Sequence, residues 1–244
     1  MKILITGASS GLGAELARRY ASPTNELFLL ARREDRLREL KIELLPKTKQ
    51  IFLIPADVTE FQSLQKKVDA LGPLDMVILN AGISLGHTEK IPTIEAFSYL
   101  YDVNVLANHA ILEILLPKMC EQHRGKIVFI SSLSSLFTMP SAKVYASSKR
   151  ALNAYAEGIR YKYLKEGIKV INILPGFIQS ELTDKNDFYM PFLLSTQAGV
   201  DKIYKAIEKE KRFYPFPLRF YLIIMFLNLL PQFLRDKIVH SKNK

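Results

Sequence analysis

Short apolar runs alternate along this chain with longer amphipathic stretches, and this alternation limits the fold more than any other feature. The apolar runs are rich in Ile, Leu, Val and Phe, which is typical of parallel strands buried on both faces. We predict strands at Lys2–Thr6, Glu26–Ala31, Ile51–Ile54, Asp75–Leu79, Lys126–Ser131 and Lys169–Leu174. We predict helices at Leu12–Tyr20, Glu34–Leu45, Glu60–Ala70, Ile94–Leu116 and Val144–Lys165.

Strands that alternate with helices favour a parallel sheet whose right-handed crossovers place helices on both faces. We therefore predict a doubly wound, Rossmann-like α/β fold. No repeat or linker divides the 244 residues, and this length suits one domain. We expect residues 1–210 to form the main body of this α/β domain. Residues 211–244 then form a basic, hydrophobic helical extension of the same domain.

A glycine-rich loop lies between the first predicted strand and the first predicted helix. It reads Thr6-Gly7-Ala8-Ser9-Ser10-Gly11-Leu12-Gly13. Glycines in such a loop allow a tight turn, close approach of a diphosphate and tight packing of the helix on the sheet. The free N–H groups and the dipole of the helix start favour an anion. The loop therefore predicts a dinucleotide site.

The loop and several later motifs resemble the short-chain dehydrogenase/reductase family over about residues 1–210. The later motifs are Asp57-Val58-Thr59, Asn80-Ala81-Gly82, Pro175-Gly176 and Ser180. They follow predicted strands, at the sheet edge where open α/β proteins bind ligands. The resemblance implies that Asp57 contacts the adenine and that Ser180 contacts the nicotinamide side. The expected cofactor-binding residues are Gly7, Ser9, Ser10, Gly11, Leu12, Gly13, Arg32, Arg33, Asp57, Val58, Asn80, Ala81, Gly82, Tyr145, Lys149, Pro175, Gly176, Ile178 and Ser180.

The end of the second predicted strand indicates which cofactor is used. NAD-dependent proteins commonly place an acid there for the ribose 2′-hydroxyl, whereas arginine accommodates a 2′-phosphate. This chain has Arg32 and Arg33, and guanidinium groups bind phosphate in a forked geometry. The alternative is that both arginines pair with Glu34 and Asp35 on the following helix. We predict NADP(H).

Tyr145 and Lys149 are four residues apart on a predicted helix, so they share one face. A free tyrosine has a pKa near ~10. A nearby ammonium stabilises the phenolate, so we expect Lys149 to lower the pKa of Tyr145 toward useful acid–base work. In the family this pair moves the proton, and the lysine also reaches the ribose hydroxyls.

Two further residues complete the catalytic set that the resemblance implies. Ser132 precedes Tyr145 by the family's spacing of thirteen residues and would orient the substrate oxygen, although Ser131 and Ser134 are close enough to confuse the register. Asn104 would hold a helix irregular and anchor a water that leads to Lys149. The expected catalytic residues are thus Asn104, Ser132, Tyr145 and Lys149.

The implied function is hydride transfer between nicotinamide and a carbonyl or secondary alcohol, with a small molecule as substrate. The alternatives are a catalytically silent NADP(H)-binding regulator and a membrane-surface scaffold. The four histidines, His87, His109, His123 and His240, lack zinc-ligand spacing, so we expect no metal. The resemblance also implies a homo-oligomer, a dimer or a tetramer.

The formal net charge of +10 invites a nucleic-acid interpretation. Most basic residues are spread among acids without a recognisable binding motif, so we expect no nucleic-acid partner. The single cysteine, Cys120, excludes an intramolecular disulfide and suits a reducing compartment. No secretory signal is visible, and we expect a cytoplasmic protein, either free or peripheral to the inner face of a membrane.

The last third of the chain holds two apolar segments. Residues 177–197 form the expected substrate loop, and the apolar run from Phe188 to Leu194 predicts an apolar substrate-facing wall. The run Phe220–Leu227 is too short to span a bilayer, which needs about 20 residues. With basic neighbours it favours peripheral membrane contact through residues 213–238. The alternatives are a helix that covers the cleft or joins two subunits.

Overall fold

Seven parallel strands form one sheet in the order β3-β2-β1-β4-β5-β6-β7. The computed structural model describes residues 1–86, 90–184, 186 and 188–241. The strands are β1 (Lys2–Thr6), β2 (Glu26–Ala31), β3 (Gln50–Pro55), β4 (Met76–Leu79), β5 (Gly125–Ile130), β6 (Ile168–Pro175) and β7 (Phe213–Phe216). The order reverses between β1 and β4, so a crevice opens where their carboxyl ends diverge. This crevice positions the site.

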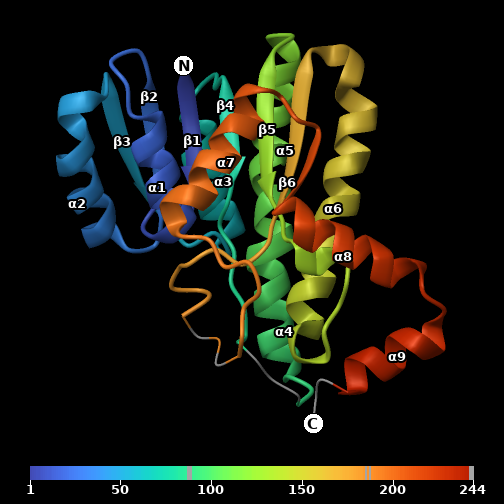
Figure 1. Cartoon of the computed structure of the whole chain (residues 1–244). Coiled ribbons are helices and arrows are strands. Elements are labelled where there is room, and N and C mark those ends of the chain that lie inside the picture. Colours follow the sequence, from blue (N-terminus) through green and yellow to red (C-terminus); the bar gives the residue numbers. More distant parts are fainter. Residues whose placement is uncertain (87–89, 185, 187, 242–244) are drawn as a thin grey trace.

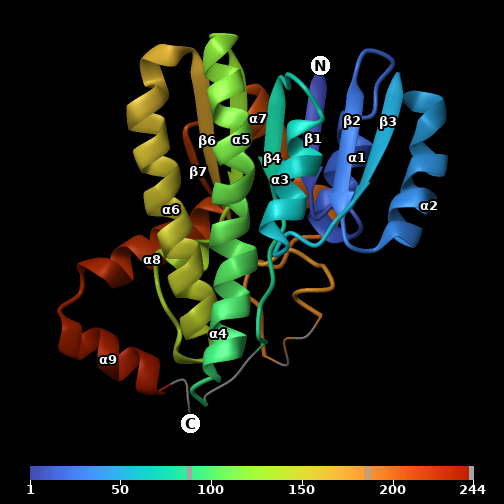
Figure 2. The same ribbon diagram turned by 180° about the vertical axis from the view of Figure 1, so that it is seen from behind.

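Helices cover both faces of the sheet (Figures 1 and 2). The helices are α1 (Gly11–Tyr20), α2 (Glu34–Leu44), α3 (Phe61–Asp69), α4 (Ile94–Tyr101), α5 (Ala107–Glu121), α6 (Lys143–Tyr163), α7 (Thr196–Glu208), α8 (Leu218–Leu229) and α9 (Gln232–Ser241). Short turns of 3-10 helix are η1 (Leu45–Lys47), η3 (Leu133–Ser135), η4 (Pro140–Ala142) and η5 (Leu164–Glu166). One buried cluster joins α1, α2 and α7 to the sheet, and a second joins α3, α5 and α6 to the other face. The predicted doubly wound α/β fold is confirmed.

The expected helix Ile94–Leu116 is interrupted. Between α4 and α5 the chain forms one π-helical turn, η2 (Asp102–Leu106). A π turn inserts one residue into the helical register, and such turns are frequent at functional sites. Here it turns Asn104 toward the end of β4, where the side chain bonds the backbone of Ile83. The irregular helix that the family resemblance implies is present.

Strand β7 and helix α7 were not among the predicted elements. β7 is four residues long and contains Pro215, and proline is tolerated in strands mainly at a sheet edge. It pairs in parallel with β6, and its Phe216 is 2% exposed. The expected extension from residue 211 therefore begins with the edge strand of the sheet. Because residues 213–216 belong to the sheet, only α8 and α9 of the segment 213–238 can provide an apolar surface outside it.

Helices α8 and α9 project from the body beside the carboxyl ends of β5 and β6 (Figure 1). In α8 only Ile224 is buried, against Leu133 and Leu174. Six other apolar side chains of α8 are exposed: Leu218, Leu222, Ile223, Met225, Phe226 and Leu229. In the described part of the chain, no helix is both long and apolar enough to cross a bilayer.

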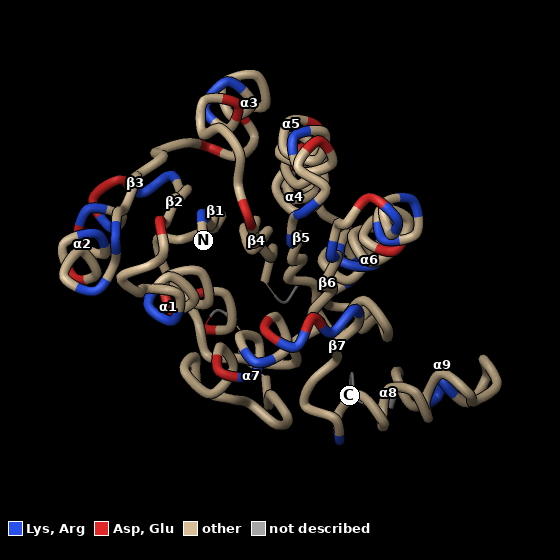
Figure 3. The backbone as a smooth tube through the Cα atoms, turned by 90° about the horizontal axis from the view of Figure 1, so that it is seen from above, with Lys and Arg blue, Asp and Glu red and all other residues tan. Residues whose placement is uncertain are grey.

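Charged residues of both signs alternate over the outer helices α2, α3, α5 and α6 (Figure 3). Several of them form ion pairs on the surface, as Arg18 does with Glu43 at 2.7 Å. Helices α8 and α9 carry few charges in the same view. The surface therefore divides into a mixed-charge body and an apolar C-terminal projection.

Candidate active site

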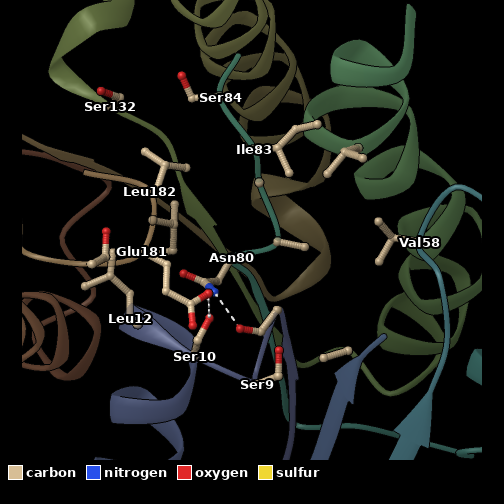
Figure 4. A pocket seen from close by; sticks show the side chains of 18 of the residues that line it. Ser9, Ser10, Leu12, Val58, Asn80, Ile83, Ser84, Ser132, Glu181 and Leu182 are labelled. Atoms are coloured by element: carbon tan, nitrogen blue, oxygen red, sulfur yellow. Dashed lines mark hydrogen bonds between the residues drawn. The ribbon is translucent and has the colours of Figure 1, made fainter. Parts of the chain in front are cut away.

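A cleft of about 430 Å³ opens at the carboxyl ends of the strands. Its lining comes from the turn after β1, the ends of β2 to β6, and the segment that follows β6. In Figure 4, Ser9 and Ser10 lie at one end of the cleft, while Ser84 and Ser132 lie at the other. The cleft thus connects the glycine loop with the region of the expected catalytic residues.

The glycine loop adopts the backbone shape that its sequence requires. Gly7 has φ +65° and Gly11 has φ +52°, a region that other L-residues rarely occupy. A Cβ on Gly7 would lie 3.0 Å from both the Ala81 Cα and the Asn80 amide nitrogen. Ser10 precedes α1 without capping it through its side chain, so the first-turn N–H groups face the cleft end. This loop and helix start can hold an anion.

Gly13 has a different place from the other two glycines. It does not line the cleft, and a Cβ there would collide with the carbonyl oxygen of Gly7. Its expected contact with the cofactor stays a prediction, and its small size serves the packing of α1 against the turn.

Hydrogen bonds join the glycine turn to the end of β4. The Thr6 hydroxyl accepts from the backbone N–H groups of Asn80 and Ala81, both at 2.9 Å. The Asn80 amide donates to the Thr6 carbonyl at 3.0 Å. These bonds hold the two strand ends on either side of the crevice at a fixed separation. Asn80 therefore supports the cleft, with its side-chain amide turned to the backbone of Thr6.

Arg32 lies at the rim of the cleft, above the end of β2. It donates a 2.7 Å hydrogen bond to the Tyr99 hydroxyl on α4 and a 3.4 Å bond to Asp57. Partial burial opposes ionisation of Asp57, but bonds from Thr59 and Arg32 outweigh it and lower the pKa of the carboxyl. Neither arginine pairs with an acid of the following helix among the described residues: Arg32 pairs with Asp57 and Arg33 with Glu181. Glu34 pairs with Arg38 instead.

Arg33 reaches across the glycine loop. Its guanidinium bonds the Ser10 hydroxyl at 2.6 Å and the Ser9 hydroxyl at 3.2 Å. It also forms two bonds, of 3.1 and 2.9 Å, to the carboxylate of Glu181. Glu181 was not among the expected site residues, because its partner lies 148 positions earlier in the chain and no local pattern marks it.

Tyr145 and Ser132 meet at the far end of the cleft. A hydrogen bond with Ser132 acts on the Tyr145 phenol, and both residues line the cleft. Ser131 is 4% exposed, and its hydroxyl donates to the Lys149 carbonyl instead. Ser134 donates to the Ser132 oxygen at 2.9 Å. The register thus places Ser132, and not its neighbours, beside Tyr145.

The electrostatics of this pair differ from the expectation. Burial raises the pKa of Tyr145 to about 12, although the bond with Ser132 opposes the rise. Burial also lowers the pKa of Lys149 to about 8. The Lys149 ammonium lies 5.8 Å from the centre of the Tyr145 ring and donates to the Ile130 carbonyl at 2.9 Å. Loss of water around the phenol therefore outweighs the hydrogen bond with Ser132, and the pKa of Tyr145 is raised where a lowering was expected.

Asn104 is fully buried behind the cleft wall and does not line it. Its amide oxygen accepts from the Ile83 N–H at 2.8 Å, and its amide nitrogen donates to the Ile83 carbonyl and the Ser148 hydroxyl, both at 3.0 Å. A Cβ on Gly82 would lie 3.3 Å from both the Asn104 oxygen and the Lys149 nitrogen. Asn104 thus fixes the segment that separates it from Lys149.

The other expected site residues divide as follows. All the expected cofactor-binding residues except Gly13 line the cleft, and so do three of the four expected catalytic residues. The lining residues that sequence reasoning missed are Ala31, Ala56, Ile83, Ser84, Tyr99, Val103, Ile130, Ser131, Glu181, Leu182 and Thr183. Nine of these eleven lie within two positions of an expected residue, before or after it, so widening each expected segment by two residues would have included their positions, although not their contacts.

The predicted substrate-facing wall is not where the cleft lies. The cleft is lined by Ser180–Thr183, and none of the described residues from Phe188 to Leu194 lines it. Tyr189 is 86% exposed, while Phe192 packs on Phe220 of α8 at a ring separation of 5.9 Å. The chain turns back after Thr183, and the Leu194 N–H then donates to the Phe177 carbonyl, so the predicted wall does not border this cleft. The apolar loop meets α8 instead.

Among the described residues, no group of three His, Cys, Asp or Glu side chains is placed to hold a metal ion. His109 instead bonds the Tyr155 hydroxyl at 2.7 Å. His87 and the side chain of His240 lie outside the described part of the chain.

A glycine loop, a helix start and a cleft at the switch point of a parallel sheet define a dinucleotide-binding α/β protein. Comparison with known proteins narrows the class. The family model for short chain dehydrogenases matches residues 1–188. The chain belongs to the short-chain dehydrogenase/reductase family of oxidoreductases.

Individual relatives agree with this assignment. An uncharacterised oxidoreductase of Mycobacterium tuberculosis (strain CDC 1551 / Oshkosh) is 37% identical over 216 residues, which is 86% of this chain and 85% of that protein. A protein of Arabidopsis thaliana named 11-beta-hydroxysteroid dehydrogenase-like 2 is 30% identical over 246 residues, 94% of this chain and 78% of that one. The solved structure of a short-chain dehydrogenase from Sphingobium yanoikuyae in complex with NADPH has a TM-score of 0.82 at 23% identity, covering 95% and 96% of the two chains.

Proposed function

We propose that this protein is an NADP(H)-dependent oxidoreductase that interconverts a carbonyl group and a secondary alcohol. The observation that carries the proposal is the cleft itself. One end holds the glycine loop and two arginines, and the other end holds Ser132, Tyr145 and Lys149 together. A cofactor that extends along the cleft would bring its reactive end to the tyrosine.

The residues present fit such a cofactor. The left-handed turns of Gly7 and Gly11 leave a cradle without side chains, where a diphosphate would bind. Arg32 and Arg33 would hold the 2′-phosphate, Asp57 the adenine side, and Lys149 the nicotinamide ribose. When bound, NADP(H) supplies or accepts the hydride. The NADPH bound to the Sphingobium yanoikuyae neighbour supports this choice.

The side chains at the far end provide the proton chemistry. Tyr145 donates a proton to the substrate oxygen in reduction and takes it back in oxidation. Ser132 lies beside the Tyr145 phenol, so it can donate a hydrogen bond to the same oxygen and orient it. Lys149, when charged, stabilises negative charge that develops on that oxygen and on the phenol.

At neutral pH Tyr145 is protonated, because burial raises the pKa of its phenol to about 12. The protonated phenol is the form that donates the proton in carbonyl reduction. Alcohol oxidation uses the phenolate, and both directions use the same groups.

We propose an apolar carbonyl compound as the substrate. Ile83 and Leu182 line the cleft, and Figure 4 shows Leu182 beneath Ser132 and Ile83 beside Ser84. Close by, Phe177 stacks on Phe220 of α8 at a ring separation of 5.9 Å. The name of the Arabidopsis thaliana relative, a hydroxysteroid dehydrogenase-like protein, agrees with a large apolar substrate.

Replacing Tyr145 with Phe tests the proposal. The variant Tyr145→Phe keeps the ring but removes the proton donor, so carbonyl reduction with NADPH should fall by about 10²–10⁴-fold. Binding of NADPH, followed by calorimetry, should change little. Turnover of a panel of apolar ketones and aldehydes measures the first effect. If the wild-type protein binds NADPH but reduces no member of the panel, the rival function, a silent NADP(H)-binding regulator, is favoured.

We also propose that α8 and α9 contact an anionic lipid surface. The exposed face of α8 is apolar apart from Arg219, which lies in its first turn. From Leu218 to Lys244 the chain has five Lys or Arg and a single acid, Asp236. An apolar helix face with an excess of positive charge suits the boundary between headgroups and acyl chains. A substrate dissolved in that layer would then lie near the cleft.

A further inference from the structure

Glu181 occupies an anion site that the cofactor would need. Its carboxylate receives two hydrogen bonds from the Arg33 guanidinium, at 3.1 and 2.9 Å, and one from the Ser10 hydroxyl at 3.0 Å. Figure 4 shows Glu181 extended from the segment after β6 to Ser10 on the glycine loop. The carboxylate therefore spans the mouth of the cleft at its glycine-loop end.

The contacts around this carboxylate suit a negative group. The Arg33 guanidinium and the Ser10 hydroxyl both donate to it, and Arg33 is itself held by bonds to the Ser9 hydroxyl at 3.2 Å and the Ser10 hydroxyl at 2.6 Å. Hydrogen bonds from Arg33 and Ser10 lower the pKa of Glu181, so the carboxylate is charged at neutral pH. Forked contacts between guanidinium and carboxylate have the same geometry as those with phosphate.

The turn that carries Glu181 is held in place by its own bonds. The Thr183 hydroxyl accepts from the Ser180 N–H at 2.8 Å and donates to the Ile178 carbonyl at 3.0 Å. A Cβ on Gly11 would lie 3.4 Å from the Ser180 Cβ, so this turn already touches the glycine loop. The bridge from Glu181 to Arg33 adds an ionic tie between the same two segments.

We propose that Glu181 is an internal competitor for the cofactor's 2′-phosphate, displaced from Arg33 when NADP(H) binds. The inference rests on the proposed function, because it takes Arg33 as a ligand of that phosphate. Both terminal nitrogens of Arg33 already bond Glu181, so the fork holds either the carboxylate or the phosphate. A cofactor without the 2′-phosphate has no group to replace Glu181 and leaves the bridge intact. Glu181 thus reduces the contribution of the 2′-phosphate to cofactor affinity. It also links cofactor binding to release of the turn after β6.

Calorimetric binding of two nicotinamide-free fragments tests this idea. The fragments are 2′,5′-ADP, which carries the 2′-phosphate, and 5′-AMP, which does not. Substitution Glu181→Gln keeps the shape of the side chain but removes the competing charge. We expect the substitution to lower the dissociation constant of 2′,5′-ADP by about 3- to 10-fold, as removal of a moderately exposed ion pair allows. The dissociation constant of 5′-AMP should change by less than about twofold.

Two controls separate local competition from general charge. Asp184 carries the same charge on the same segment, but among the described residues the acid that pairs with Arg33 is Glu181. Asp184→Asn should leave both dissociation constants unchanged. In an Arg33→Met background, Glu181→Gln should no longer tighten 2′,5′-ADP, because the contested partner is gone.

The outcomes distinguish this inference from the proposed function. If the wild-type protein prefers 2′,5′-ADP to 5′-AMP and Glu181→Gln does not strengthen that preference, the competition is refuted while the cofactor assignment stands. Equal tightening by Asp184→Asn, or a persistent effect without Arg33, also refutes it. If the wild-type protein binds 2′,5′-ADP no better than 5′-AMP, the NADP(H) assignment is wrong, and the competition falls with it.

Discussion

Lys149 is 3% exposed at the bottom of the cleft, and its ammonium donates to the carbonyl of Ile130. Burial without a carboxylate partner in the described surroundings explains why its pKa falls to about 8. A lysine with this pKa loses its charge inside the range where enzymes are usually assayed. Tyr145, with a pKa of about 12, does not.

The pH profile of carbonyl reduction should therefore report Lys149. The ammonium is charged below about pH 8 and neutral above it, so kcat/KM for the ketone should be level below that pH. It should fall by about tenfold per pH unit above it. Assays at saturating NADPH between pH 6 and 10 measure this. In Lys149→Arg, whose guanidinium does not titrate there, the residual rate should lack this inflection; a wild-type profile that stays level to pH 10 would contradict the assignment.

Gly13 offers a test of packing at single-residue resolution. A Cβ at this position meets the Gly7 carbonyl, so Gly13→Ala should lower the free energy of unfolding by about 1–3 kcal/mol. Gly158 is the matched control, because it lies on exposed α6 surface with open space around its Cβ direction. Gly158→Ala should raise the free energy of unfolding by about 0.8–1.0 kcal/mol through helix propensity. Urea denaturation measures both, and changes of the same sign would count against this explanation.

At the scale of elements, α8 combines one buried contact with a broad apolar exposed face. Leu222 is 55% exposed and Phe226 is 63% exposed, one helical turn apart. Such a surface has no stabilising role in the chain alone, since the side chains that hold α8 in place, Ile224 and Phe220, lie on its other side. Contact with an apolar phase would explain its composition.

Vesicle binding tests the proposed role of this face. The full chain should co-sediment with vesicles that contain anionic lipid, and less with purely zwitterionic ones. Leu222→Glu combined with Phe226→Glu should reduce the bound fraction by about tenfold or more, because two carboxylates would enter the acyl boundary. Ile42→Glu is the control, because Ile42 is exposed on α2 at the other end of the molecule. This substitution should leave the bound fraction unchanged. Wild-type protein that stays in the supernatant with both vesicle types would exclude this role.

At the scale of the whole molecule, the cleft brings together segments that lie far apart in the chain. Its lining runs from Gly7 to Thr183 and crosses the crevice between the two halves of the sheet. A ligand that contacts both sides stabilises the folded state as a unit, by an amount set by its concentration relative to its dissociation constant.

Cofactor binding should therefore raise the melting temperature. At a concentration of 100 times its dissociation constant, NADPH should add about 2.7 kcal/mol, which corresponds to about 5–10 °C for a chain of this size. NADH at the same concentration should produce a smaller shift, because it lacks the 2′-phosphate for Arg32 and Arg33. Differential scanning fluorimetry compares the two cofactors. Equal shifts would argue against the proposed preference for NADP(H).

Much of this architecture could be read from local sequence patterns. The six predicted strands are all present within one or two residues, because buried parallel strands require continuous apolar runs. The four-residue β7 was not predicted, because Pro215 and the exposed Phe213 make its sequence unlike that of a buried strand. The glycine loop was predictable because a left-handed turn at Gly7 needs that residue type.

The amino-acid sequence by itself determined the parallel sheet, the glycine turn and the set of side chains at the strand ends, because each depends on patterns within a few residues. The tertiary structure alone decided how those side chains act on one another. Burial set the pKa values of Tyr145 and Lys149, which depend on the surrounding solvent and not on spacing. The pairing of Arg33 with Glu181 depends on β2 and the segment after β6 meeting at one edge of the sheet. Such contacts exist only once the chain is folded.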